Sequence, residues 1–74
     1  MSMISFAEMK VLVLSRIDGK IKDMPLSEKM RPQLIINFHP YTYLELKSQI
    51  ERGTEDGKLY VYQEATKLGY AVSG

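Results

Sequence analysis

Residues 5–24 read SFAEMKVLVLSRIDGKIKDM, and the fold depends on which of two structures this segment adopts, because its pattern fits both. Ser5 and Glu8 have the spacing of a helix capping box. Helical spacing (i, i+3, i+4, i+7, i+8) then follows at Met9, Leu12, Val13, Arg16 and Ile17. One interpretation is therefore a helix from about Ser5 to Ile17.

The second interpretation is a β-hairpin, and it is the one we favour from sequence. Val11, Val13 and Ile17 are β-branched, which suits a strand. Asp18-Gly19 is a typical type I′ turn, in which both central residues need positive φ. The expected hairpin pairs residues 9–17 with residues 20–24.

Prolines divide the next part of the chain. Pro25 ends the hairpin, and residues 26–31 are expected to be a connector with one helical turn. Residues 33–39 form a short apolar run between Pro32 and Pro40. This run predicts a central strand that is buried on both sides, with Leu34, Ile36 and Phe38 on one face and Ile35 on the other.

A capped helix is predicted after Pro40. Thr42 stands three residues before Glu45, which is the capping-box spacing, and Tyr43, Leu46 and Ile50 follow at helical intervals. Gly53 supplies the left-handed residue that ends many helices. The expected helix covers residues 43–52.

The C-terminal part is predicted to begin with a turn and a strand. Glu55-Asp56-Gly57 has turn composition, and residues 58–62 alternate in a way typical of a strand. Residues 63–72 allow either a helix over 63–68 or a hairpin closed by residues 69–72. The predicted class is therefore α+β, a small antiparallel sheet of order ββ-β-α-β packed with one main helix, in a single small domain of residues 1–74.

Composition excludes several classes of protein. The 74 residues contain no cysteine, so we expect no disulfide framework. Their formal net charge is +1, so we expect no strong overall electrostatic attraction to phosphate groups. No apolar run is long enough to span a membrane, and no signal-peptide pattern is present. The expected location is cytoplasmic.

Catalytic equipment is not visible in the sequence. His39 is the only histidine, and neither a phosphate-binding glycine motif nor a nucleophile-elbow motif occurs. His39 precedes Tyr41 and Tyr43, which suggests a general acid or base, but it has no evident carboxylate partner. We therefore expect no enzyme activity, metal or cofactor, and interpret His39 as the end of a strand.

Tyr60 and Tyr62 offer a second functional interpretation. On one face of a strand they would form a stacking platform for single-stranded nucleic acid, helped by scattered Lys and Arg. Tyrosine packing or a protein interface is the interpretation we prefer, because Tyr is amphipathic and commonly half-buried.

The predicted hairpin has apolar residues on both faces, and one short helix cannot cover both. The excess predicts a small non-enzymatic protein-interaction module that forms a homodimer or joins a larger assembly. A nucleic-acid-binding domain is the alternative. The residues expected at the interface are Val11, Val13, Ile17, Met24, Tyr60 and Tyr62.

Overall fold

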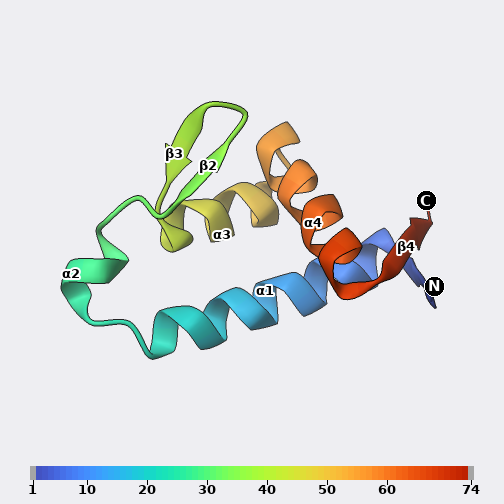
Figure 1. Ribbon diagram of the computed structural model, residues 1–74, viewed down its shortest axis with the longest axis horizontal. Coiled ribbons are helices and arrows are strands. Elements are labelled where there is room, and N and C mark those ends of the chain that lie inside the picture. The colour runs from blue at the N-terminus through green and yellow to red at the C-terminus, as the bar shows by residue number, and fades with distance from the viewer. Residues whose placement is uncertain (1, 74) are drawn as a thin grey trace.

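The computed structural model describes residues 2–73 as an α+β fold in which helices dominate (Figure 1). The elements are β1 (Ser2–Ser5), α1 (Phe6–Lys22), α2 (Leu26–Lys29), β2 (Leu34–Ile36), β3 (His39–Tyr41), α3 (Tyr43–Arg52), α4 (Glu55–Leu68) and β4 (Tyr70–Ser73). The strands form two separate pairs, β1 with β4 and β2 with β3. The α+β class is confirmed, whereas the ββ-β-α-β order and the single main helix are wrong.

The stretch 5–24 is a helix, and the favoured hairpin is wrong. Ser5 is the N-cap, and its hydroxyl accepts a hydrogen bond from the Glu8 N–H at 3.1 Å. Met9, Val13 and Ile17 form one buried stripe along α1. A continuous stripe buries these three side chains in one core, and this gain outweighs the local turn preference of Asp18-Gly19.

Residues 33–39 do not form one central strand, because the chain reverses in their middle. Asn37 and Phe38 both have positive φ, 53° and 67°, as a type I′ turn requires. The antiparallel pairs are Leu34 with Tyr41, Ile35 with Pro40, and Ile36 with His39. One face of this hairpin packs on the core through Ile36 and Tyr41, and Ile35 points to the opposite, exposed face.

Helix α3 confirms the prediction for residues 43–52. The capping box is complete, since the Thr42 hydroxyl accepts from the Glu45 N–H at 3.1 Å and the Glu45 carboxylate accepts from the Thr42 N–H at 2.9 Å. These bonds lower the pKa of the Glu45 carboxyl, the backbone N–H of Thr42 having the largest effect. Gly53 ends the helix in the left-handed conformation.

Helix α4 replaces the turn and strand predicted over residues 55–62. Thr54 caps it by accepting from the Gly57 N–H at 3.2 Å, so Glu55-Asp56-Gly57 is its first turn. The buried residues follow a helical rather than an alternating period: Gly57, Tyr60, Val61, Glu64 and Ala65. The helical alternative for residues 63–68 is confirmed as the second half of α4.

The last strand pairs with the first rather than closing a hairpin. Gly69 ends α4 with a φ of 81°, and β4 then runs parallel to β1, with Ile4 opposite Val72. A pairing between segments so far apart in the chain has no local sequence signal. It places the two described ends side by side at one end of the molecule (Figure 1).

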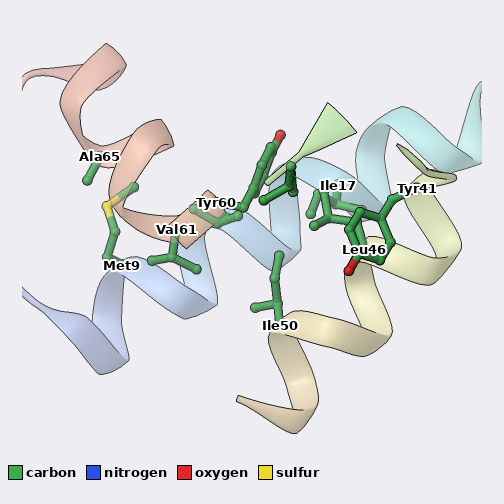
Figure 2. Close-up of a cluster of buried hydrophobic side chains, with 10 residues drawn as sticks. Met9, Ile17, Tyr41, Leu46, Ile50, Tyr60, Val61 and Ala65 are labelled. Atoms are coloured by element: carbon green, nitrogen blue, oxygen red, sulfur yellow. The ribbon is translucent and has the colours of Figure 1, made fainter. Parts of the chain in front are cut away.

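The core lies where α1, α3 and α4 meet, and the β2–β3 hairpin covers one side of it (Figures 1 and 2). Its buried hydrophobic residues are Met9, Val13, Ile17, Ile36, Tyr41, Leu46, Ile50, Tyr60, Val61 and Ala65. Gly57 lets α4 approach α3 closely, since a Cβ there would lie 2.6 Å from the carbonyl carbon of Gln49. The hairpin is therefore anchored on a three-helix core.

Candidate functional site

The six residues predicted at an interface are divided between the core and the surface. Val13, Ile17 and Tyr60 are buried within the chain itself. Val11 and Tyr62 are exposed and Met24 is half-buried. The structure does not bring these six side chains together on one face.

Tyr60 and Tyr62 do not form a stacking platform. They lie two positions apart on α4, where side chains point in nearly opposite directions. Tyr60 is buried in the core, whereas the ring of Tyr62 lies at the surface, 5.4 Å from the ring of Phe6. The geometric basis for base stacking is therefore absent at this pair.

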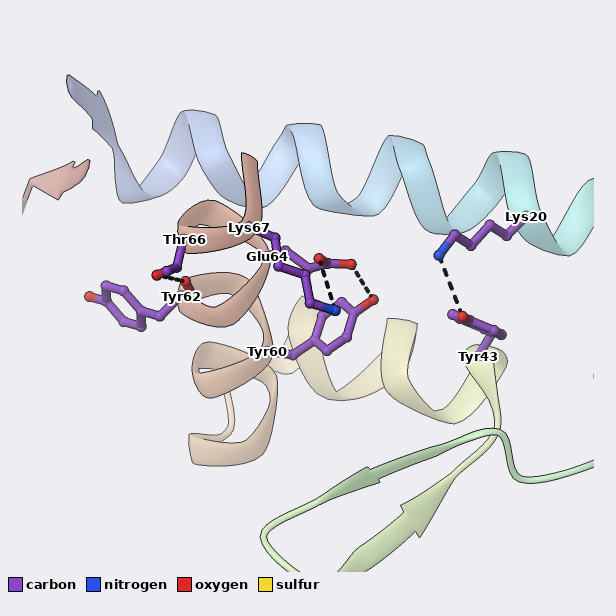
Figure 3. Close-up of polar contacts among 7 residues, drawn as sticks. All are labelled: Lys20, Tyr43, Tyr60, Tyr62, Glu64, Thr66 and Lys67. Carbon is purple, nitrogen blue, oxygen red and sulfur yellow. Dashed lines mark hydrogen bonds and ion pairs between the residues drawn. The ribbon is translucent and has the colours of Figure 1, made fainter. Parts of the chain in front are cut away.

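Tyr60 instead belongs to a polar cluster inside α4 (Figure 3). Its hydroxyl donates a 2.7 Å hydrogen bond to Glu64, a carboxylate that is itself buried. Lys67 Nζ lies 3.9 Å from the other oxygen of Glu64. Burial and this hydrogen bond raise the pKa of Tyr60. The cluster satisfies a buried carboxylate, which is a structural task.

His39 is exposed beside the hairpin turn, on the same face of β3 as Tyr41, and its ring is 4.4 Å from the ring of Tyr41. The Tyr41 hydroxyl donates to the carboxylate of Asp56, and this hydrogen bond raises the pKa of Tyr41. It connects the hairpin to the first turn of α4. Within residues 2–73, no group of three or more His, Cys, Asp or Glu side chains is placed to hold a metal ion.

Tyr43, the other tyrosine near His39, faces α1 rather than the histidine (Figure 3). Lys20 Nζ donates to its hydroxyl at 3.5 Å and lies 5.3 Å from the centre of its ring. On the next turn of α3, Lys47 forms a 2.8 Å ion pair with Asp18, which raises the pKa of Lys47. These contacts attach α3 to α1. Among the described residues, no carboxylate forms a hydrogen bond with His39.

The exposed hydrophobic side chains are concentrated elsewhere. Among the described residues, five large hydrophobic side chains are more than 70% exposed, and four of these lie between residues 26 and 38. We call these four residues the apical surface: Leu26, Met30, Ile35 and Phe38. Figure 1 shows α2 at the end of the molecule away from both ends of the chain, and the hairpin projecting with its turn directed away from α2, so the apical surface has one part on α2 and another on the hairpin.

Phe38 is the most unusual residue of the apical surface. It is 96% exposed, although it occupies the second turn position with a φ of 67°. Glycine is strongly preferred at this position because a Cβ is strained in the left-handed region. An exposed Phe adds little packing to offset that strain, so folding stability does not explain its presence.

Sequence reasoning missed this site because it placed Phe38 in a strand beside Leu34 and Ile36. A usable signal was nevertheless present, since Asn is favoured at the first position of a type I′ turn and Asn37 stands between two apolar segments. The usual Asn-Gly signal of a type I′ turn is absent here, because Phe38 stands where glycine is expected.

Residues 2–73 enclose no cavity, and none of their helices combines the length and apolar character needed to cross a bilayer. Comparison of the chain with protein-family models, curated proteins and solved structures finds no match.

Proposed function

We propose that this chain is a small, non-enzymatic, cytoplasmic protein-interaction module that binds a partner through its apical surface. The observation that carries the proposal is Phe38, a fully exposed aromatic side chain held in a backbone conformation that favours glycine. Strained residues of this kind persist where the surrounding structure supports them, and they cluster at functional sites.

The hairpin that carries Phe38 is suited to be a rigid binding element. Its inner face is fixed to the core by Ile36 and Tyr41, and the Tyr41 hydroxyl is hydrogen-bonded to Asp56. A hairpin whose backbone is already fixed loses less entropy on binding than a flexible loop. Aromatic residues, Phe among them, are also enriched at protein interfaces relative to the rest of the surface.

Replacement of Phe38 by glycine tests whether the residue is retained at a cost to stability. Phe38→Gly should stabilise the fold by about 0.5–1 kcal/mol, because relief of roughly 1–2 kcal/mol of left-handed strain exceeds the backbone entropy that glycine loses on folding. Thermal unfolding followed by circular dichroism should show a Tm higher by a few degrees.

Phe38→Ala is the matched control, since it removes the ring and keeps a Cβ in the strained conformation. Its Tm should stay close to that of the parent, because the ring makes little contact in the monomer. If Phe38→Gly is less stable than the parent, Phe38 contributes to folding and the proposal loses its main support.

A further inference from the structure

We infer that residues 25–33, which carry α2, open separately from the rest of the fold and contain a site of limited proteolysis, the Lys29–Met30 bond. We call residues 25–33 the α2 segment. Its burial, its hydrogen bonds and its packing all differ from those of the other elements. These differences hold whatever partner the apical surface binds, so they go beyond the proposed function.

No side chain of the α2 segment is buried. Lys29 is half-buried, and every other residue of the segment is exposed, including Leu26 and Met30 at 71% and 72%. The nearest hydrophobic side chains that pack against the core are Ile21, before the segment, and Leu34, after it. Opening of the segment therefore uncovers little additional apolar surface, and the hydrophobic effect opposes it only weakly.

The hydrogen bonds of the α2 segment are almost all local. The backbone N–H groups of residues 28–31 donate to carbonyl groups no more than four residues earlier, at 3.0–3.2 Å. The Gln33 side chain donates to the Glu28 carbonyl at 3.0 Å, and the Gln33 N–H ties the end of the segment to the Tyr41 carbonyl at 3.0 Å. A single helical turn is marginal by itself, and water can replace exposed bonds of this kind when the turn opens.

Helix α2 also lacks a packing partner among the described elements. Every other helix and strand packs closely against at least one neighbour, whereas α2 packs closely against none. Figure 1 shows α2 set apart from α3 and α4, on the excursion between α1 and β2. The hairpin, in contrast, is held to the core by Ile36 and Tyr41. The α2 part of the apical surface can therefore move while the hairpin part stays in place.

The Lys29–Met30 bond is the bond of the α2 segment that a trypsin-like protease would cut. Such a protease requires a basic side chain before the bond and an extended backbone, which the opened segment offers. The other basic residue, Arg31, is followed by Pro32, whose ring and missing N–H block cleavage. Hydrolysis adds one water across the bond and leaves a carboxylate on Lys29 and an amino group on Met30. The fragments should stay together, because α1 packs on α3 and α4 and β1 pairs with β4.

Brief digestion of the native chain with trypsin, followed by mass spectrometry, tests this inference. The first cut should fall after Lys29. Lys29→Gln should slow the first cut at least about tenfold, because the next sites lie in elements that open less often. Lys58→Gln, at an exposed lysine of α4, is the matched control and should leave the rate unchanged. A native chain that is first cut elsewhere would overturn the inference.

Urea distinguishes separate opening from global unfolding. Opening of an exposed turn uncovers little surface, so about 1 M urea should change the rate of the first cut less than about twofold. Cleavage through global unfolding would accelerate roughly fivefold and would contradict separate opening. An unstructured peptide digested in the same urea corrects for the activity of trypsin. The stability of Phe38→Gly tests the proposed function separately, so failure of one is distinguishable from failure of the other.

Discussion

Gly57→Ala is the substitution to which the packing of α4 on α3 should respond most strongly. A Cβ at residue 57 would lie 2.6 Å from the carbonyl carbon of Gln49 and 2.7 Å from the backbone nitrogen of Ile50, and the Gln49 carbonyl oxygen is closer still. These are backbone atoms, so no flexible side chain can move aside. The two helices must separate along a contact that buries Ile50 and Val61.

Two opposing effects determine how much unfolding free energy Gly57→Ala loses. Overpacking of a core contact costs about 1–3 kcal/mol, and the clash with backbone atoms places Gly57→Ala at the upper end of that range. The better helix propensity of alanine offsets about 0.5–1 kcal/mol. We therefore expect a net loss of about 2 kcal/mol, which lowers the Tm of a domain of this size by about 8–16 °C.

Gly19→Ala is the internal control for this experiment. Gly19 lies in α1, and a Cβ there meets no atom within 4 Å, so alanine should stabilise the fold by about 0.5–1 kcal/mol. Circular dichroism with urea unfolding measures both variants. A Gly57→Ala variant as stable as the parent would refute the close α3–α4 contact. A destabilised Gly19→Ala would indicate a turn rather than a helix at that residue.

Three further substitutions test the core and the caps. Val13→Lys should unfold the chain rather than merely alter association, because it places a charge at a side chain that is 1% exposed; far-ultraviolet circular dichroism shows the outcome. Tyr60→Phe should cost about 1–3 kcal/mol near neutral pH by removing the donor to buried Glu64. Because the folded-state pKa of Tyr60 is raised, the stability linked to its protonation is complete below about pH 10 and is lost at higher pH, so the parent should weaken more steeply than Tyr60→Phe in an alkaline titration. Thr42→Ala should cost about 1 kcal/mol of unfolding free energy, measured in urea, by breaking the capping box with Glu45.

The elements predicted correctly are those whose signals are local. The capping box of Thr42 and Glu45 and the stop at Gly53 lie within a dozen residues, and α3 has the predicted bounds. Ser5 and Glu8 carry the same kind of signal, and the helical alternative that they indicate is the correct one. Short-range hydrogen bonds at helix ends depend on few residues, so they are visible in sequence.

The errors arise where a short turn or strand pattern competes with a longer helical period. Asp18-Gly19 favours a hairpin, but the buried stripe of Met9, Val13 and Ile17 keeps the helix continuous through it. The alternation over residues 58–62 is equally short, whereas the helical period of α4 continues to Ala65. Burial in the tertiary structure favours the helix in both cases. It stabilises a long helix with a buried face more than a local turn stabilises a hairpin or a short strand.

The candidate site was the least predictable feature. Phe38 was expected to share a strand face with Leu34 and Ile36, and only the reversal at Asn37 moves it to an exposed tip. Exposed apolar side chains do occur, but four of the most exposed ones lie on α2 and the hairpin, whereas Val11 is the exposed large hydrophobic residue of the stretch 9–24. The packing of the helices determines the set of apolar residues that stays exposed. No single segment of the sequence specifies that packing.

A dilution series followed by two-dimensional NMR of the uniformly labelled chain tests most directly the claim that the apical surface is the binding surface. If a second copy is the partner, backbone amide shifts should change with concentration in residues 26–40, with the largest changes at Ile35 and Phe38. The amides around Val11 should stay constant, because the exposed side of α1 lies outside the contact. Shift changes that centre on Val11 would contradict the account, whereas shifts that are independent of concentration up to the millimolar range would exclude a second copy as the partner.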